Sequence, residues 1–159
     1  MKWDDLSGEP CSIARTSAVI GDRWTLLVLR EAFTGTRRFD AFQAALGISR
    51  TIVTNRLAVL VEHGVLERTA YQGRPVRHEY ALTDKGRELH PLLLAMFHWG
   101  DRHYGGEAGP PIILHHSVCG HDFHADSVCS HCAQPVRVDD VEVRPGPGYR
   151  RARPKHAGA

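Results

Sequence analysis

Apolar residues recur at helical spacing through the first part of the chain and predict three short helices there. The first helix covers residues 12–20 and ends at Gly21. The second follows Asp22, whose side chain can cap it, and the third covers residues 38–46. The positions expected to be buried in the second and third helices are Trp24, Leu27, Val28, Ala32, Phe39, Phe42 and Leu46.

A fourth helix is predicted over residues 49–63, after a tight turn at residues 47–49. Ser49 can accept a hydrogen bond from the free amides at its start, and Gly64 ends it. One stripe of this helix is apolar and consists of Val53, Leu57, Leu60 and Val61. The opposite side carries short, mostly polar side chains, at Thr51, Thr54, Asn55, Ala58 and Glu62.

Beyond the fourth helix the pattern changes from helical to alternating. Residues 65–71 and 76–82 are rich in β-forming residues, and residues 72–75 between them predict a β-hairpin with a basic tip. Thr83 is expected to cap a last long helix over residues 84–104. The apolar band of that helix is wider than one small domain has to cover, so it fits the seam of a dimer. The band consists of Leu89, Leu92, Leu93, Met96, Trp99 and Gly100.

Composition agrees with a soluble globular protein: 159 residues, 42% hydrophobic and 24% charged. The longest apolar stretches fall far short of the ~20 residues that a membrane span needs. No apolar signal segment follows Met1, and the four cysteines do not form a disulfide framework. These features predict a cytoplasmic protein without a membrane partner.

The net charge of +2 hides a segregation of charge along the chain. Residues 1–36 carry a net charge of −1 and residues 37–87 a net charge of +4. Residues 88–143 carry −6, and residues 144–159 carry +5. A basic segment beside an acidic one indicates a polyanionic partner for one face of the protein.

The second, third and fourth helices, together with the hairpin that follows them, form a winged helix-turn-helix, in which the short turn joins the third and fourth helices. This fold favours binding to double-stranded DNA. Arg50 can reach a guanine edge or a phosphate, and Asn55 can pair with an adenine edge. The hairpin tip offers Arg74, with Arg77 behind it, to the minor groove or the backbone. The candidate DNA contacts are Arg37, Arg38, Ser49, Arg50, Thr51, Thr54, Asn55, Arg74 and Arg77.

Two other functions stay open from the residues alone. A winged helix can also dock other proteins, and such a protein would show no salt-dependent affinity for DNA. A metal-dependent enzyme would need an open coordination site and a general base. No His-Glu-x-x-His or comparable pattern is present, so the sequence favours a protein that is not an enzyme.

Eight histidines and cysteines crowd the segment after the last helix: His115, His116, Cys119, His121, His124, Cys129, His131 and Cys132. The pairs His116-x-x-Cys119 and Cys129-x-x-Cys132 can converge on one tetrahedral ion, as in a zinc ribbon. A module of about 30 residues with few large apolar side chains needs such a source of folding energy. Alternating valines at positions 136, 138, 141 and 143 predict strands beside the second pair.

We therefore expect a structural zinc ion bound by His116, Cys119, Cys129 and Cys132. The fourth ligand stays open, because His115, His121 or His124 could replace His116. A redox dithiol at Cys129 and Cys132, or three unrelated thiols, are the alternatives to a zinc site.

These patterns predict a mainly α fold of the α+β class. It would be a winged helix-turn-helix with a long C-terminal dimerisation helix and a small zinc-ribbon-like β module. Residues 1–104 would form the DNA-binding and dimerisation domain, followed by a linker over residues 105–111. Residues 112–143 would form the zinc-ribbon-like module, and residues 144–159 a basic disordered tail.

Several ordered runs between Cys11 and about Gly100 resemble the HxlR-type winged-helix regulators of bacteria, relatives of the MarR type. They are Cys11-Ser12-Ile13, Ile20 to Arg30, Gly35 to Phe39, Gly47-Ile48-Ser49, Thr54 to Leu57, and Glu79 to Thr83 with Gly86 following. The resemblance implies a homodimer that reads an inverted repeat through an interface of the N-terminal segment and the long C-terminal helix. The chain departs from the family pattern at Asn55, where glutamine is common, and at Val76 and His78. These departures bear on which DNA sequence is read.

Cys11 lies just before the first helix, where unpaired amides and the helix dipole stabilise a thiolate, with Arg15 one turn further on. Some members of the family use a cysteine here to sense oxidants or electrophiles, so the resemblance implies a redox sensor. The alternative is a small residue packed beneath the dimer helix. We therefore expect a repressor that occludes a promoter. The resemblance implies its release signal, a small molecule or an oxidant that changes the dimer geometry.

Overall fold

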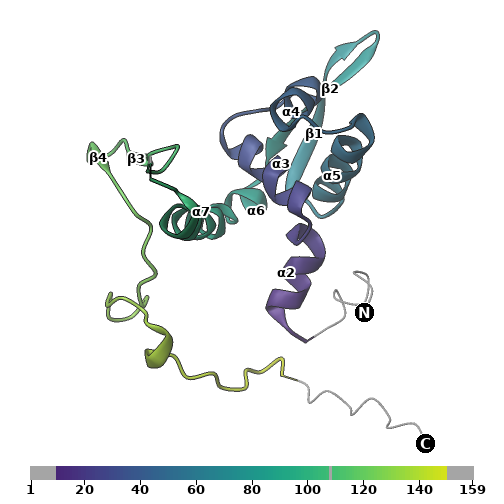
Figure 1. Cartoon of the computed structure of the whole chain (residues 1–159). Coiled ribbons are helices and arrows are strands. Elements are labelled where there is room, and N and C mark those ends of the chain that lie inside the picture. The colour runs from purple at the N-terminus through teal and green to yellow at the C-terminus, as the bar shows by residue number, and fades with distance from the viewer. Residues whose placement is uncertain (1–9, 108, 150–159) are drawn as a thin grey trace, which may run out of the picture. The chain divides into compact units, whose positions relative to one another are not determined.

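The computed structural model describes residues 10–107 and 109–149 (Figure 1). The described residues divide into two compact units. The first contains residues 10–87 and 144–149, and the second contains residues 88–143. Residues 150–159 of the predicted tail lie outside the described part of the chain.

The first unit contains four helices, a hairpin and one further short helix in chain order (Figure 1). Its elements are α2 (Ser12–Ile20), α3 (Arg23–Phe33), α4 (Phe39–Leu46), α5 (Arg50–Glu62), β1 (Leu66–Gly73), β2 (Val76–Leu82) and α6 (Asp84–Arg87). Helices α3, α4 and α5 pack on one another and on the hairpin. The largest side chains that this packing removes from water are Phe42, Leu29, Leu57, Leu60, Leu66, Val28 and Val53.

The helix starts follow the capping residues that the sequence indicates. Asp22 accepts hydrogen bonds from the backbone amides of Trp24 and Thr25, at 2.9 and 3.2 Å, and so begins α3. Ser49 accepts from the amide of Ile52 at 3.4 Å and begins α5. These caps confirm the predicted start of both helices.

Strands β1 and β2 pair antiparallel from Leu66 opposite Leu82 to Gly73 opposite Val76. The strands run closer to the tip than predicted, since only Arg74 and Pro75 lie between them. A register shift between Ala70 and Gln72 leaves Tyr71 outside the ladder.

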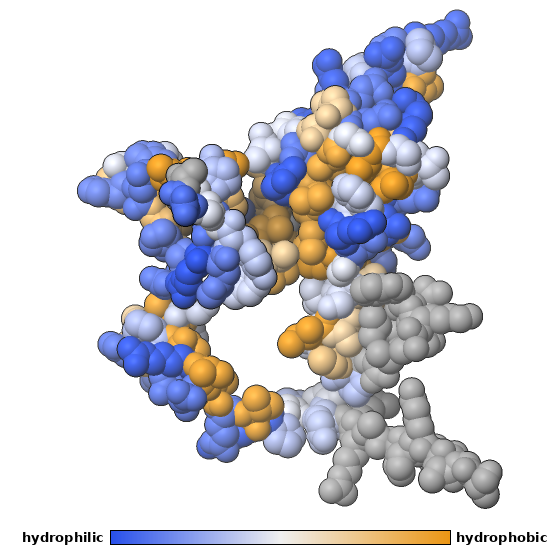
Figure 2. All heavy atoms as spheres, viewed as in Figure 1, coloured by the Kyte–Doolittle hydropathy of each residue, from blue (hydrophilic) through white to orange (hydrophobic). Residues whose placement is uncertain are grey.

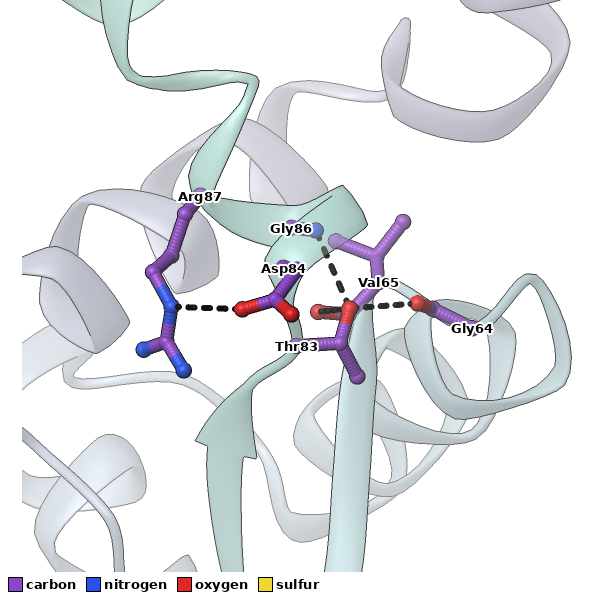
Figure 3. Close-up of polar contacts among 6 residues, drawn as sticks. All are labelled: Gly64, Val65, Thr83, Asp84, Gly86 and Arg87. Atoms are coloured by element: carbon purple, nitrogen blue, oxygen red, sulfur yellow. Dashed lines mark hydrogen bonds and ion pairs between the residues drawn. The ribbon is translucent and has the colours of Figure 1, made fainter.

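Thr83 joins the end of the hairpin to the start of α6 (Figure 3). Its hydroxyl donates to the carbonyl oxygen of Gly64 at 2.7 Å and accepts from the amide of Gly86 at 3.0 Å. The Arg87 guanidinium pairs with Asp84 one turn away, at 3.4 Å. Thr83 therefore caps α6, as the sequence predicts, and ties it to the loop that follows α5.

The predicted continuous helix over residues 84–104 is wrong. The helix stops after Arg87 and resumes as α7 (His90–Tyr104), with Pro91 in its first turn. Proline lacks an amide hydrogen, and its ring clashes with the carbonyl four residues earlier, so a helix cannot continue through it without a break.

The rest of the second unit has little regular structure. A two-stranded pair, β3 (His115–His116) and β4 (His121–Asp122), is followed by a 3₁₀ turn, η1 (Val138–Asp140). The strands predicted from the valines at positions 136 to 143 are therefore wrong. The valine side chains there are exposed, so no packing fixes an extended conformation.

Within the described residues, no single helix is long and apolar enough to cross a membrane. Helices α4 and α5 pass such a test only as a pair, which is bent by 120°.

Candidate nucleic-acid interface

Helices α4 and α5 form the helix-turn-helix. The turn between them begins with Gly47 in the left-handed region, at a φ of +62°, and continues through the buried Ile48 to the cap Ser49. A bend of 120° between two helices joined by a short turn is typical of this motif. Val53, Leu57 and Leu60 anchor α5 in the core, which turns its opposite side outward.

All nine candidate DNA contacts are exposed in the structure. Thr51, Thr54 and Asn55 lie on the outward side of α5. The Thr54 hydroxyl donates to the carbonyl oxygen of Arg50 at 2.9 Å, which leaves its methyl group and lone pairs for a partner. The outward side of α5 is therefore polar and accessible, as a recognition helix requires.

Arg50 is held at the N-terminal end of α5 by the first turn of α4. Its guanidinium lies 4.5 Å from the centre of the Phe39 ring, and 3.5 Å separates it from the Asp40 carboxylate. The side chains of Arg50 and Asp40 are more than two thirds exposed, so solvent weakens this ion pair. A phosphate oxygen can therefore take the place of Asp40 at little cost.

Arg38 connects the start of α4 to the hairpin. Its backbone forms an isolated bridge with Glu79, and its Nε lies 3.3 Å from the Glu79 carboxylate. The guanidinium also lies 4.9 Å from the centre of the Tyr71 ring. The neighbouring Arg37 accepts a hydrogen bond from the amide of Tyr80 through its carbonyl oxygen, at 2.8 Å, which leaves its side chain exposed.

A hollow of about 450 Å³ lies where the first turns of α4 and α5 meet the hairpin. It brings together three arginines that are far apart in the sequence, Arg38, Arg50 and Arg77. The outer end of the hairpin, labelled in Figure 1, is covered mainly by hydrophilic residues in the same view in Figure 2. The residues that line this arginine hollow are Arg38, Phe39, Asp40, Arg50, Tyr71, Pro75, Val76, Arg77, His78 and Tyr80.

Sequence reasoning missed Asp40 and Tyr71 in this hollow, and singled out His78 only as a departure from the family pattern. Asp40 carried no local signal, because its contact with Arg50 depends on how α4 packs against α5. The position of Tyr71 had none, because it follows from the register shift in the hairpin. Arg74 lies at the tip, where its carbonyl oxygen accepts a hydrogen bond from the side-chain Nε2 of Gln72 at 3.1 Å.

Cys11 occupies the N-cap position of α2 and is exposed. Its carbonyl oxygen accepts the first helical hydrogen bond, from the amide of Arg15 at 3.0 Å. Within this chain the residue is not packed into a core.

The four predicted metal ligands form two pairs in the second unit. The Nδ1 atom of His116 lies 3.2 Å from the Cys119 sulfur. The backbone amides of Cys132 and His131, with the Cys132 side chain, donate to Cys129 and lower the pKa of its thiol. Among the described residues, no three His, Cys, Asp or Glu side chains gather around one point. The structure therefore shows His116 with Cys119 and Cys129 with Cys132 as two separate pairs.

The HxlR-like helix-turn-helix family matches residues 19–108, which is more than half of the chain. The chain belongs to this family. The predicted winged-helix fold is confirmed, and the protein is a helix-turn-helix transcriptional regulator. The relatives found are named as transcriptional regulators or transcription factors, in agreement with the prediction that the chain is not an enzyme.

The similarity of this HxlR-like regulator to its relatives extends beyond the winged helix. The HTH-type transcriptional regulator Rv3095 of Mycobacterium tuberculosis is 43% identical over 141 residues, covering 87% of this chain and 88% of the relative. The crystal structure of PA1607, named as a transcription factor, is 36% identical, covers 89% of this chain and 99% of its own, and has a TM-score of 0.81. The family match ends at residue 108, and both alignments cover more residues of this chain than the 108 up to that point. Both similarities therefore extend into the C-terminal segment.

A shorter similarity connects the chain to HypR, which is named as a redox regulator and whose structure is solved in its oxidised form. The two chains are 32% identical, and the match covers 58% of this chain and 96% of HypR with a TM-score of 0.53.

Proposed function

We propose that this regulator is a sequence-specific repressor that binds an inverted-repeat operator as a homodimer. The observation that carries the proposal is the arginine hollow beside the N-terminal end of α5. With α5 in the major groove, Thr51, Thr54 and Asn55 meet base edges while Arg38, Arg50 and Arg77 hold phosphates. Arg74 at the hairpin tip reaches the adjacent minor groove or backbone. A dimer bound in this way occludes a promoter from the polymerase.

The outward side of α7 supports the homodimer. No described residue of α7 is buried within the single chain. Leu92, Met96 and Trp99 recur at spacings of four and three residues, and 41%, 45% and 56% of their surfaces are exposed. A contiguous apolar stripe of this kind is typical of an interface with a second copy. Two copies related by a two-fold axis present two α5 helices to two half-sites.

The experiment is a selection of sheared genomic DNA on the purified full-length protein, followed by a salt titration on the best fragment. We expect an enriched inverted repeat and an affinity that falls steeply with salt concentration. Absence of enrichment with folded, dimeric protein would contradict direct DNA binding and favour a winged helix that docks proteins. Transcription in vitro from the enriched promoter then separates repression from activation, because a repressor lowers the yield of transcript.

An oxidant or electrophile acting on Cys11 is the proposed release signal. Cys11 is exposed at the N-cap position of α2, where an oxidant can reach its sulfur. We expect peroxide to lower operator affinity in the unmodified chain and to have no effect on Cys11→Ser. An equal response of both proteins would mean that Cys11 has a packing role, and that the release signal is a small molecule acting elsewhere.

A further inference from the structure

Two turns of matching backbone geometry follow each other in the second unit. In the first, the amide of Gly120 donates to the carbonyl oxygen of His116 at 2.8 Å, and Gly120 has a φ of +74°. In the second, the amide of Ala133 donates to the carbonyl oxygen of Cys129, also at 2.8 Å, and Ala133 has a φ of +56°. Each turn thus places the left-handed residue directly after a cysteine, Cys119 or Cys132.

The left-handed conformation of Ala133 is notable because an alanine there costs about 1 kcal/mol. Among the described residues, it is the only one other than glycine with a positive φ. Such a conformation persists where the surrounding structure needs it. The shape of the second turn is therefore maintained although the sequence lacks the glycine that the first turn has.

Each turn is closed by paired backbone segments on both sides. Strands β3 and β4 flank the first turn, with His116 opposite His121. The second turn is flanked by a bridge between Val128 and Pro135, and the amide of Cys129 donates to the carbonyl oxygen of Gln134 at 2.9 Å. This frame brings the first and fourth residues of each turn together, His116 with Cys119 and Cys129 with Cys132.

The segment that holds these turns has no hydrophobic core of its own. From Asp101 to Tyr149, no described residue is buried. Val118, Val138 and Val143 expose 86%, 87% and 93% of their surfaces. Burial of apolar surface thus cannot fix the arrangement of the two turns, and another source of folding energy is needed.

We propose that the two turns bind one structural zinc ion through His116, Cys119, Cys129 and Cys132. Three thiolates and one imidazole form a closed tetrahedral set without a position for substrate. Because the two pairs stand apart in the structure, metal binding draws the turns together and completes the fold of this segment. Residues 124–126 lie between the bonded frames of the two turns and act as the hinge of this closure.

The contacts of the other histidines favour His116 as the fourth ligand. His115 pairs with Asp122 at 3.0 Å, and the Nδ1 of His121 lies 2.8 Å from the carbonyl oxygen of Cys119. The His124 ring lies against that of His98, with the two ring centres 4.6 Å apart. The matching first turn, in which a histidine replaces one cysteine, also argues against a redox dithiol, since that chemistry would need only the second turn.

The test measures zinc in the full chain purified under reducing conditions, after release with a thiol-modifying reagent. We expect about one zinc ion per chain and a loss of nearly all of it in Cys119→Ser, Cys129→Ser and His116→Asn. Cys11→Ser and His124→Gln are matched controls that should keep the metal. Cobalt added to the apo chain should give the visible bands of a tetrahedral site with thiolate ligands.

A second measurement tests the closure without relying on variants. Chelation should increase proteolysis and hydrogen exchange within residues 112–143 and leave those within residues 10–87 unchanged. Reduced protein without stoichiometric metal would overturn the proposal. So would a zinc content that only Cys129 and Cys132 variants lower. Neither readout involves DNA, so failure of the zinc site is distinguishable from failure of the repressor proposal.

Discussion

The backbone of Gly86 packs directly against the carbonyl oxygen of Val65, with no space for a side chain between them (Figure 3). A Cβ at this position would overlap that oxygen and crowd the Leu82 side chain. At an uncrowded helix position, replacing glycine by alanine raises the free energy of unfolding by about 1 kcal/mol. A decrease at Gly86 would therefore indicate the close contact. We expect Gly86→Ala to lower the free energy of unfolding by about 2 kcal/mol, measured by urea denaturation.

The matched control is Gly73→Ala, at the outer end of β1, where a Cβ would meet no atom within 4 Å. This substitution should change stability by less than about 0.5 kcal/mol. Equal stability of the two variants would mean that Gly86 of α6 and Val65, directly before β1, are not in close contact in solution.

Thr25 is fully buried on α3, and its hydroxyl has no hydrogen-bond partner among the described residues. A buried polar group without a partner costs free energy that valine, of nearly equal shape, avoids. We expect Thr25→Val to raise the free energy of unfolding by about 1 kcal/mol and the melting temperature by about 4 °C. Thr69→Val, on the exposed side of β1, should leave the melting temperature nearly unchanged. A lower melting temperature for Thr25→Val would show that the hydroxyl has a partner in solution.

Arg77 lines the arginine hollow and is exposed on β2. In a phosphate contact it contributes to affinity for any DNA sequence, so Arg77→Ala should weaken specific and non-specific binding alike. The slope of log affinity against log salt should fall by about 1. Arg30→Ala removes an exposed arginine paired with Glu31 on α3, outside the hollow, and should leave the slope unchanged. A normal slope for Arg77→Ala would place the hairpin off the DNA.

Asp40 lines the hollow and pairs with Arg50, so in the proposed complex it would compete with a phosphate for that guanidinium. Asp40→Asn removes this competition and a repulsive charge, at the cost of a weak exposed ion pair. We expect operator affinity to rise about threefold at low salt, with a smaller gain at high salt. The gain should be smaller when Arg50 is also replaced by alanine, because only the removal of the repulsive charge then remains. An equal gain in that double variant would assign the effect to net charge alone.

Trp99 lies on the exposed apolar stripe of α7. If this stripe forms the dimer interface, Trp99→Glu buries an unpaired carboxylate there and should shift the protein to monomers. Sedimentation velocity would detect the change, and operator affinity should fall with it. Ala45→Glu introduces the same group at an exposed position of α4, outside the stripe, and should remain dimeric. A dimeric Trp99→Glu protein would move the interface to another surface.

The order and type of elements in the winged helix could be predicted because each is determined locally. Asp22 and Ser49 cap helices through bonds that span two or three residues, and the apolar stripe of α5 depends only on the 3.6-residue period. The break before α7 carried a local signal as well, in Pro91, but the continuous apolar band outweighed it in the prediction. The prediction of strands at the valines was wrong because it rested on a local pattern alone. Alternating valines do not determine an extended conformation unless a partner strand or a packed face is present.

The sequence by itself therefore determined the helix-turn-helix, the hairpin and the outward face of α5. It also determined the two pairs of candidate ligands, one His-Cys and one Cys-Cys. Only the tertiary structure decided that Arg38, Arg50 and Arg77 line one hollow, that Asp40 and Tyr71 belong to it, and that Gly86 must be a glycine. These facts depend on contacts between residues tens of positions apart, and on a register shift in one hairpin. Such contacts follow from how the elements pack, because no local period or cap encodes which side chains meet across a turn of the chain.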